Sequence, residues 1–136
     1  MRKTLQCIAA TAALLVLGIA TAAQAQDWYA QREERFREER WRAHLFSEVR
    51  EDLDHVQSVT FSGRDEYRIV RTKEELNDLQ ADLAEHRYDE AKLDDVIGGL
   101  QRVVDDNRMS GRDRDMLNDD LQRMKDYRAH HADWGQ

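Results

Sequence analysis

From Leu45 onward, apolar residues recur every three or four positions, the spacing of one face of an α-helix. The apolar positions are Leu45, Val49, Leu53 and Val56, with Phe46 beside them; Leu76, Leu79 and Leu83; Leu93, Val96, Ile97, Leu100, Val103 and Val104; and Met116, Leu117, Leu121 and Met124. Short connections between such segments make consecutive helices antiparallel neighbours. The pattern therefore predicts an all-α fold, an antiparallel bundle of about four helices with a charged N-terminal helical arm.

Polar residues mark where several of these helices begin. Thr72 with Glu75, and Ser110 with Asp113, have the spacing of a capping box, and Asp89 is placed as an N-cap. Residues 59–63 form the only irregular-looking stretch and are the expected break in the chain. Residues 65–70 fit a short extended segment as well as the start of the next helix.

The charged arm is the first half of a helix that we expect to begin near Asp27 and run towards Ser58. Between Gln31 and Arg42 its only large apolar residues are Phe36 and Trp41. Five positions along a helix correspond to a rotation of about 140° away from a shared face, so these two side chains cannot form one stripe against a core. We predict that Phe36 and Trp41 are partner-binding residues, with Trp41 the stronger anchor, because indoles are enriched among interface hot spots.

The N-terminal residues have the order of a secretory signal peptide. Arg2 and Lys3 precede an uncharged apolar run over residues 8–20, and Ala23-Gln24-Ala25 supplies the small residues of a cleavage site. We predict a signal peptide over residues 1–25, an N-terminal helix with the arm over residues 26–58, and a bundle region over residues 59–136. The apolar run is shorter than the roughly 20 residues of a membrane-spanning helix, which makes an uncleaved anchor the second reading. A periplasmic or secreted location follows, without a stable membrane span after cleavage.

Charge and cysteine content narrow the classes of partner. The formal net charge is −7, and it becomes −9 once Arg2 and Lys3 leave with the signal peptide. A net-negative chain is repelled by nucleic acid, so we expect no nucleic-acid partner. Cys7, the only cysteine, also leaves with the signal, and the mature chain then has no disulfide.

No residue pattern predicts catalysis, a cofactor or a metal centre. His130 and Asp126 have helical i,i+4 spacing, but neighbouring His130 and His131 point about 100° apart on a helix, which does not suit one metal. The acids that follow Asp105 lack the oxygen and glycine positions of a calcium-binding EF-hand loop. Gly98-Gly99 lies inside a predicted helix, where either a close helix contact, a groove for a partner or simple tolerance accounts for it.

The stretch from Glu74 to Trp134 supports a resemblance to known proteins. With Asp106-Asn107-Arg108-Met109-Ser110 and Arg112-Asp113-Arg114-Asp115 at its centre, it resembles small, uncharacterised exported bacterial helical proteins. By architecture the chain is similar to periplasmic helical stress chaperones of the Spy and CpxP type, although their Leu-Thr-x-x-Gln signature is absent here. The second resemblance implies a helical fold and chaperone-like binding without catalysis.

The expected function is therefore that of an exported, non-enzymatic helical binding module, chaperone-like or related to envelope stress, that contacts protein partners through helical surfaces. The alternative is a structural, self-associating coiled-coil protein of the cell envelope.

Overall fold

The computed structural model describes residues 20–37 and 39–134. Within those residues the chain forms α-helices and short 3-10 helices, and no strand. The elements are α1 (Ala20–Arg37), η1 (Glu39–His44), α2 (Leu45–Ser58), α3 (Gly63–Ala84), α4 (Glu90–Asp106), α5 (Gly111–His130) and η2 (His131–Asp133). The predicted all-α class is confirmed.

The chain divides into two compact units, Met1–Glu39 and Arg40–Gln136. The described part of the first unit consists of α1 and the first residue of η1. The second unit contains the rest of η1, the four long helices α2 to α5, and η2.

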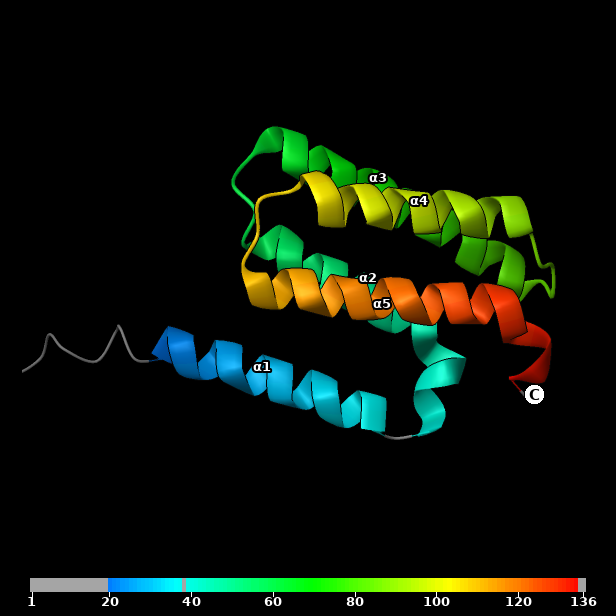
Figure 1. The fold of residues 1–136 in the computed structure, drawn as a ribbon, viewed down its shortest axis with the longest axis horizontal. Helices are drawn as coiled ribbons and strands as arrows, with labels where there is room; N and C mark the ends of the chain where they lie inside the picture. The colour runs from blue at the N-terminus through cyan, green and yellow to red at the C-terminus, as the bar shows by residue number, and fades with distance from the viewer. Residues whose placement is uncertain (1–19, 38, 135–136) are drawn as a thin grey trace, which may run out of the picture. The chain divides into compact units, whose positions relative to one another are not determined.

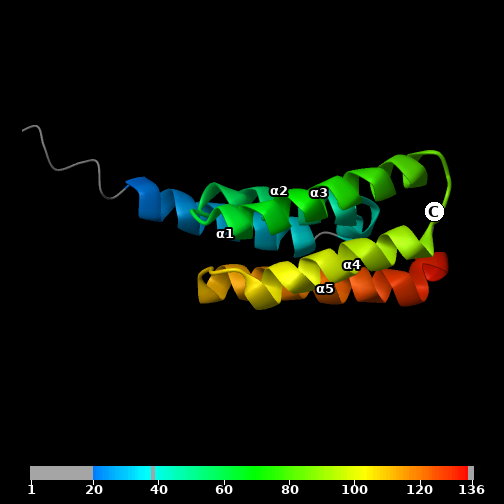
Figure 2. The ribbon, with the colours of Figure 1, turned by 90° about the horizontal axis from the view of Figure 1, so that it is seen from above.

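The four long helices of the second unit form an antiparallel bundle. In Figure 1, α3 and α4 lie along one side of the unit, and α2 and α5 lie along the other. In Figure 2 the same helices separate into an α2–α3 pair and an α4–α5 pair. The two views agree with the helix contacts, in which α2 packs on α3 and α5, and α4 packs on the same two helices. Residues 59–62, 85–89 and 107–110 make the short connections.

The centre of this bundle holds the apolar stripes. The large apolar residues with no more than 8% exposure are Leu45, Phe46, Val49, Leu53, Val56, Ile69, Leu76, Leu79, Leu93, Val96, Leu100, Val103, Val104, Met116, Leu117, Leu121 and Met124. Leu83 and Ile97, expected in the core, are half-buried instead. Leu83 lies one turn after the buried Leu79, near the end of α3, and Ile97 follows the buried Val96 in α4, so both are at the edge of their stripes rather than at the centre.

The first helix differs from its prediction in both its start and its continuity. The predicted signal peptide falls largely on residues 1–19, which lie outside the described residues, while residues 20–25 belong to α1, so this helix begins before Asp27. The single helix expected up to Ser58 is divided into α1, η1 and α2. Residues 31–44 have no continuous apolar stripe to hold one straight helix against a core. None of the described helices has the length and apolar character needed to cross a membrane.

Thr72 does not begin a helix, and the residues before it are not extended. Helix α3 begins at Gly63 after the N-cap position Ser62, so the ambiguous segment 65–70 is helical. Within α3 the Thr72 hydroxyl donates a 2.9 Å hydrogen bond to the Arg68 carbonyl one turn earlier. A Thr-x-x-Glu sequence inside a helix therefore imitated a capping box.

The other two predicted helix starts are confirmed. The Asp89 carboxylate accepts a 3.2 Å hydrogen bond from the Lys92 amide at the start of α4. The Ser110 hydroxyl accepts a 3.1 Å bond from the Asp113 amide at the start of α5. Each bond satisfies an amide that has no partner within its own helix.

Candidate functional site

Trp41, the predicted anchor, lies in η1 and belongs to the bundle unit. Its ring meets the ring of Trp134 edge to face at 5.4 Å between centroids. Trp134 in turn meets Tyr127 of α5 edge to face at 5.3 Å. The half-buried Trp41 and Trp134 thus join the first and the last segments, in chain order, of the bundle unit.

These rings belong to a larger aromatic cluster, which we define as Trp41, Phe46, Tyr88, Tyr127, His131 and Trp134. Phe46 packs edge to face on Tyr127 at 5.0 Å, and the His131 imidazole stacks on Tyr88 at 4.0 Å. Burial raises the pKa of Tyr127 above its ordinary value. The cluster therefore ties η1, α2, the α3–α4 connection and α5 together at one end of the bundle.

Two arginines lie on the indole faces of this cluster. The Arg123 guanidinium is 4.4 Å from the centre of the Trp41 ring. The Arg42 guanidinium is 5.3 Å from the Trp134 ring and 5.7 Å from the Trp41 ring. Cations at such distances are attracted by the ring quadrupole, so much of the Trp41 surface is already engaged within its own unit.

Phe36, the second predicted partner-binding residue, lies in α1 and is half-buried. The Arg32 guanidinium, one turn earlier, lies 4.5 Å from the centre of its ring. Phe36 and Trp41 belong to different units, and their role in binding a partner stays a prediction.

The most exposed large apolar side chain of the described residues is one that the sequence reading did not single out. Phe61 is 98% exposed in the α2–α3 connection, and Val59 beside it is 50% exposed. We call residues 59–62 the Phe61 loop. The loop is anchored because the Val59 and Thr60 amides donate hydrogen bonds of 3.2 and 3.1 Å to the end of α2. A signal existed in the sequence, since Phe61 is an aromatic residue inside the predicted break and belongs to no stripe.

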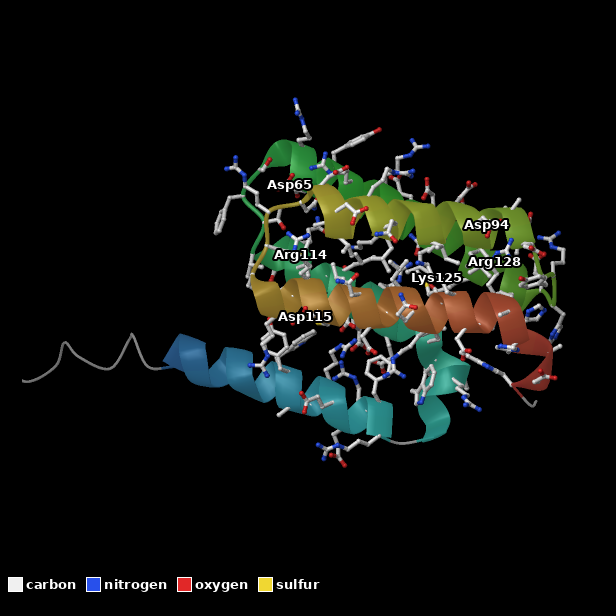
Figure 3. All side chains as sticks on the ribbon, viewed as in Figure 1. Asp65, Asp94, Arg114, Asp115, Lys125 and Arg128 are labelled. Carbon is white, nitrogen blue, oxygen red and sulfur yellow. The ribbon has the colours of Figure 1, made fainter. Side chains whose placement is uncertain are left out.

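The acids near residue 105 lead into the turn between α4 and α5. The buried Asn107 side chain accepts a 2.6 Å hydrogen bond from Arg68 Nε and donates a 3.0 Å bond to the Asp65 carbonyl. The Arg108 amide donates to the Asp65 carboxylate at 3.0 Å, and Arg114 donates to the Asn107 carbonyl at 3.0 Å. Figure 3 shows Asp65 and Arg114 at this end of the bundle. The network joins the start of α3 to the α4–α5 turn.

The C-terminal histidines have separate surroundings. His130 Nδ1 lies 4.0 Å from the Asp133 carboxylate, whereas His131 stacks in the aromatic cluster. Across residues 20–37 and 39–134, no group of three or more His, Cys, Asp or Glu side chains is arranged to hold a metal ion.

Charged pairs hold the helices together at several points. Arg128 of α5 donates to both carboxylate oxygens of Asp94 on α4, at 2.5 and 3.1 Å, and the two residues face each other in Figure 3. The bond from Arg128 holds the pKa of Asp94 below its ordinary value. Between α2 and the first turn of α5, His55 Nε2 lies 3.3 Å from the buried Asp113 carboxylate. These contacts join α4 to α5 and α2 to α5.

Comparison with known proteins does not assign the chain to a family. No family model matches the chain, and neither a curated protein nor a solved structure matches it. The resemblance to exported helical proteins and to the Spy and CpxP type of chaperone stays a prediction.

Proposed function

We propose that the chain is an exported, non-enzymatic helical binding module that contacts an apolar segment of a protein partner. In this proposal the bundle is a rigid support, and the Phe61 loop is the principal contact. A chaperone-like role, in which the partner is an incompletely folded protein, is the form of this function that we test first.

The observation that carries the proposal is the exposure of Phe61. The bundle buries most of the side chains of its apolar stripes, yet Phe61 and Val59 remain 98% and 50% exposed in one short connection. Burying a phenylalanine side chain contributes about 1.5–3 kcal/mol of favourable free energy. The chain by itself does not obtain this free energy, because Phe61 is exposed. A partner that covers the loop would gain it, and the loop backbone is already held by the end of α2.

The test compares Phe61→Ala with a matched control, Tyr67→Ala, which removes another exposed aromatic ring from α3. The measurement is the aggregation of reduced α-lactalbumin, followed by light scattering in the presence of each protein. The native mass of each protein is measured in parallel. Because Phe61 makes no core contact, its substitution should change the free energy of unfolding by less than about 0.5 kcal/mol.

We expect the wild-type protein and Tyr67→Ala to suppress aggregation, and Phe61→Ala to lose most of this effect. Equal suppression by all three proteins would remove the Phe61 loop from the function. A wild-type oligomer that becomes monomeric on Phe61→Ala would instead support the alternative, a self-associating structural protein.

Export is tested separately, because it depends on the N-terminal residues alone. We expect N-terminal sequencing of protein recovered from the periplasm or the medium to begin at Gln26, directly after Ala23-Gln24-Ala25. A chain recovered from membranes with Met1 intact would replace export with anchoring.

A further inference from the structure

A pocket with a volume of about 300 Å³ lies between α3 and α4, and it shares no residue with the aromatic cluster or the Phe61 loop. Its lining residues are Tyr67, Arg68, Arg71 and Thr72 from α3, and Gly99 and Arg102 from α4. Three of these six residues are arginines, each with a guanidinium group. Such a grouping is unexpected on a chain whose formal net charge is −7.

The two helices bring these arginines together for simple geometric reasons. Tyr67 and Arg71, and likewise Arg68 and Thr72, are four residues apart, so each pair lies on one strip of α3. On α4, Gly99 has no side chain and so lets this helix approach the Thr72 and Glu75 side chains of α3 closely. A Cβ atom at residue 99 would lie 2.8 Å from the Thr72 hydroxyl oxygen.

The arginines differ in how far their charge is already neutralised. Arg68 Nη2 lies 2.6 Å from the Asp65 carboxylate, and Arg71 Nε lies 3.4 Å from the Glu75 carboxylate. Arg102 is exposed and makes no hydrogen bond or ion pair with the described residues. Three guanidinium groups therefore meet two carboxylates, and the unneutralised charge is on the α4 side of the pocket.

If Arg102 served only to keep the chain soluble, nothing would be gained by placing its guanidinium group beside Arg68 and Arg71. Like charges close together repel, and each guanidinium offers several N–H donors in a planar fork that suits phosphate oxygens. A bound oxyanion would remove the repulsion and use the free donors of Arg102. Like any arginine, Arg71 is charged at neutral pH, and the Tyr67 hydroxyl and the Glu75 carboxylate raise its pKa further.

We propose that the pocket between α3 and α4 binds a phosphate group through Arg71 and Arg102, with Arg68 contributing positive charge from its inner wall. The phosphate is either free or the terminal group of a small phosphomonoester, since the pocket volume accommodates both. This binding site is independent of the partner contact proposed for the Phe61 loop.

The experiment is calorimetric titration of the full-length mature protein with inorganic phosphate, glycerol 3-phosphate and acetate. All titrations are made near neutral pH and at one ionic strength. The test variant is Arg102→Gln, which removes an exposed and unpaired side chain and leaves the core intact. The control is Lys125→Gln, which makes the same change of net charge on an exposed position of α5 (Figure 3). Arg102→Lys keeps the charge but loses the planar fork.

We expect saturable binding of at least one of the two phosphates, weakened about tenfold or more by Arg102→Gln and unchanged by Lys125→Gln. Arg102→Lys should fall between the wild-type protein and Arg102→Gln. Preference for inorganic phosphate or for glycerol 3-phosphate identifies the source of the group. Acetate binding as tight as phosphate binding, equal affinity in Arg102→Gln, or no saturable binding at tens of millimolar phosphate would overturn the proposal.

Discussion

Gly98 and Gly99 are adjacent in α4, but a methyl group would meet different surroundings at each position. At residue 98 the nearest atom to an added Cβ is a terminal nitrogen of Arg102 at 3.8 Å, an ordinary contact. At residue 99 the Cβ would lie 2.8 Å from Thr72 Oγ1 and 3.3 Å from Thr72 Cγ2. Because both branches of Thr72 are close, rotating that side chain exchanges one clash for the other.

The two glycines therefore predict opposite outcomes for the same substitution. Alanine is better than glycine within a helix by about 1 kcal/mol, so Gly98→Ala should raise the free energy of unfolding. Gly99→Ala gains the same helix propensity but overpacks the α3–α4 contact, and should be less stable than Gly98→Ala by about 1–3 kcal/mol. Urea melts of the two variants measure this difference. Equal stabilities would show that the α3–α4 contact makes room for the added methyl group without a loss of stability.

At the scale of single residues, the sequence alone predicted only part of what the structure shows. It named a close helix contact among the explanations for Gly98-Gly99, but it could not choose between the two glycines, since the choice depends on which turn of α3 faces α4. It also took Thr72 for a helix start. The error was physical, because a threonine side chain bonds to a preceding carbonyl inside a helix as readily as it caps one.

At the scale of elements, the end of α3 carries backbone strain. The Arg87 amide donates to the Asp82 carbonyl at 2.9 Å, and the His86 amide donates to the Leu83 carbonyl at 3.0 Å. These two bonds form a Schellman motif, which needs a left-handed residue directly after the C-cap. His86 takes that conformation, with φ of 58°, although glycine adopts it without a steric cost.

Replacing His86 with glycine should therefore stabilise the protein. Relief of the left-handed strain is worth roughly 1–2 kcal/mol, and the greater freedom of glycine in the unfolded chain offsets about 0.4–1 kcal/mol of it. We expect thermal melts to show a net gain for His86→Gly and none for His86→Ala, which keeps the Cβ atom. A gain of the same size in both variants would place the effect in the lost imidazole rather than in the backbone.

How well each element could be predicted follows from how many local signals agreed. For α4 and α5 the apolar stripe and the N-cap residue pointed to the same boundary, and both helices form as expected. For the charged stretch before Leu45 only helix-forming composition was present. Composition alone does not determine where a helix stops, and η1 was missed for that reason.

At the scale of the whole molecule, the sequence showed which residues are apolar but not which of them meet. The stripes predicted most of the core, because burial follows from helical periodicity. The contact of Trp41 with Trp134 and the pairing of Asp94 with Arg128 depend on how helices are placed in the bundle, which no local pattern encodes. Phe61 was overlooked because residues 59–63 were read only as a break in the chain.

Charge pairs that join neighbouring elements predict how stability depends on pH. The Asp82 carboxylate near the end of α3 accepts hydrogen bonds from Lys92 at 2.6 Å and from Arg87 at 2.9 Å. The bond from Lys92 is the largest cause that holds the pKa of Asp82 below its ordinary value of 3.8. Arg128 has the same effect on the pKa of Asp94.

A carboxyl group whose pKa is lower in the folded than in the unfolded state stabilises the fold above its unfolded pKa. That contribution is lost as the pH falls through the lower, folded value. We therefore expect Asp82→Asn to be less stable than the wild-type protein near neutral pH, and the gap to narrow as the pH falls below the ordinary pKa of 3.8. Urea melts at several pH values measure the gap. Asp115→Asn, an exposed position on α5 (Figure 3), is the control and should follow the wild-type curve. A gap for Asp82→Asn that stays constant into acid would mean that the Lys92 contact acts through packing rather than through charge.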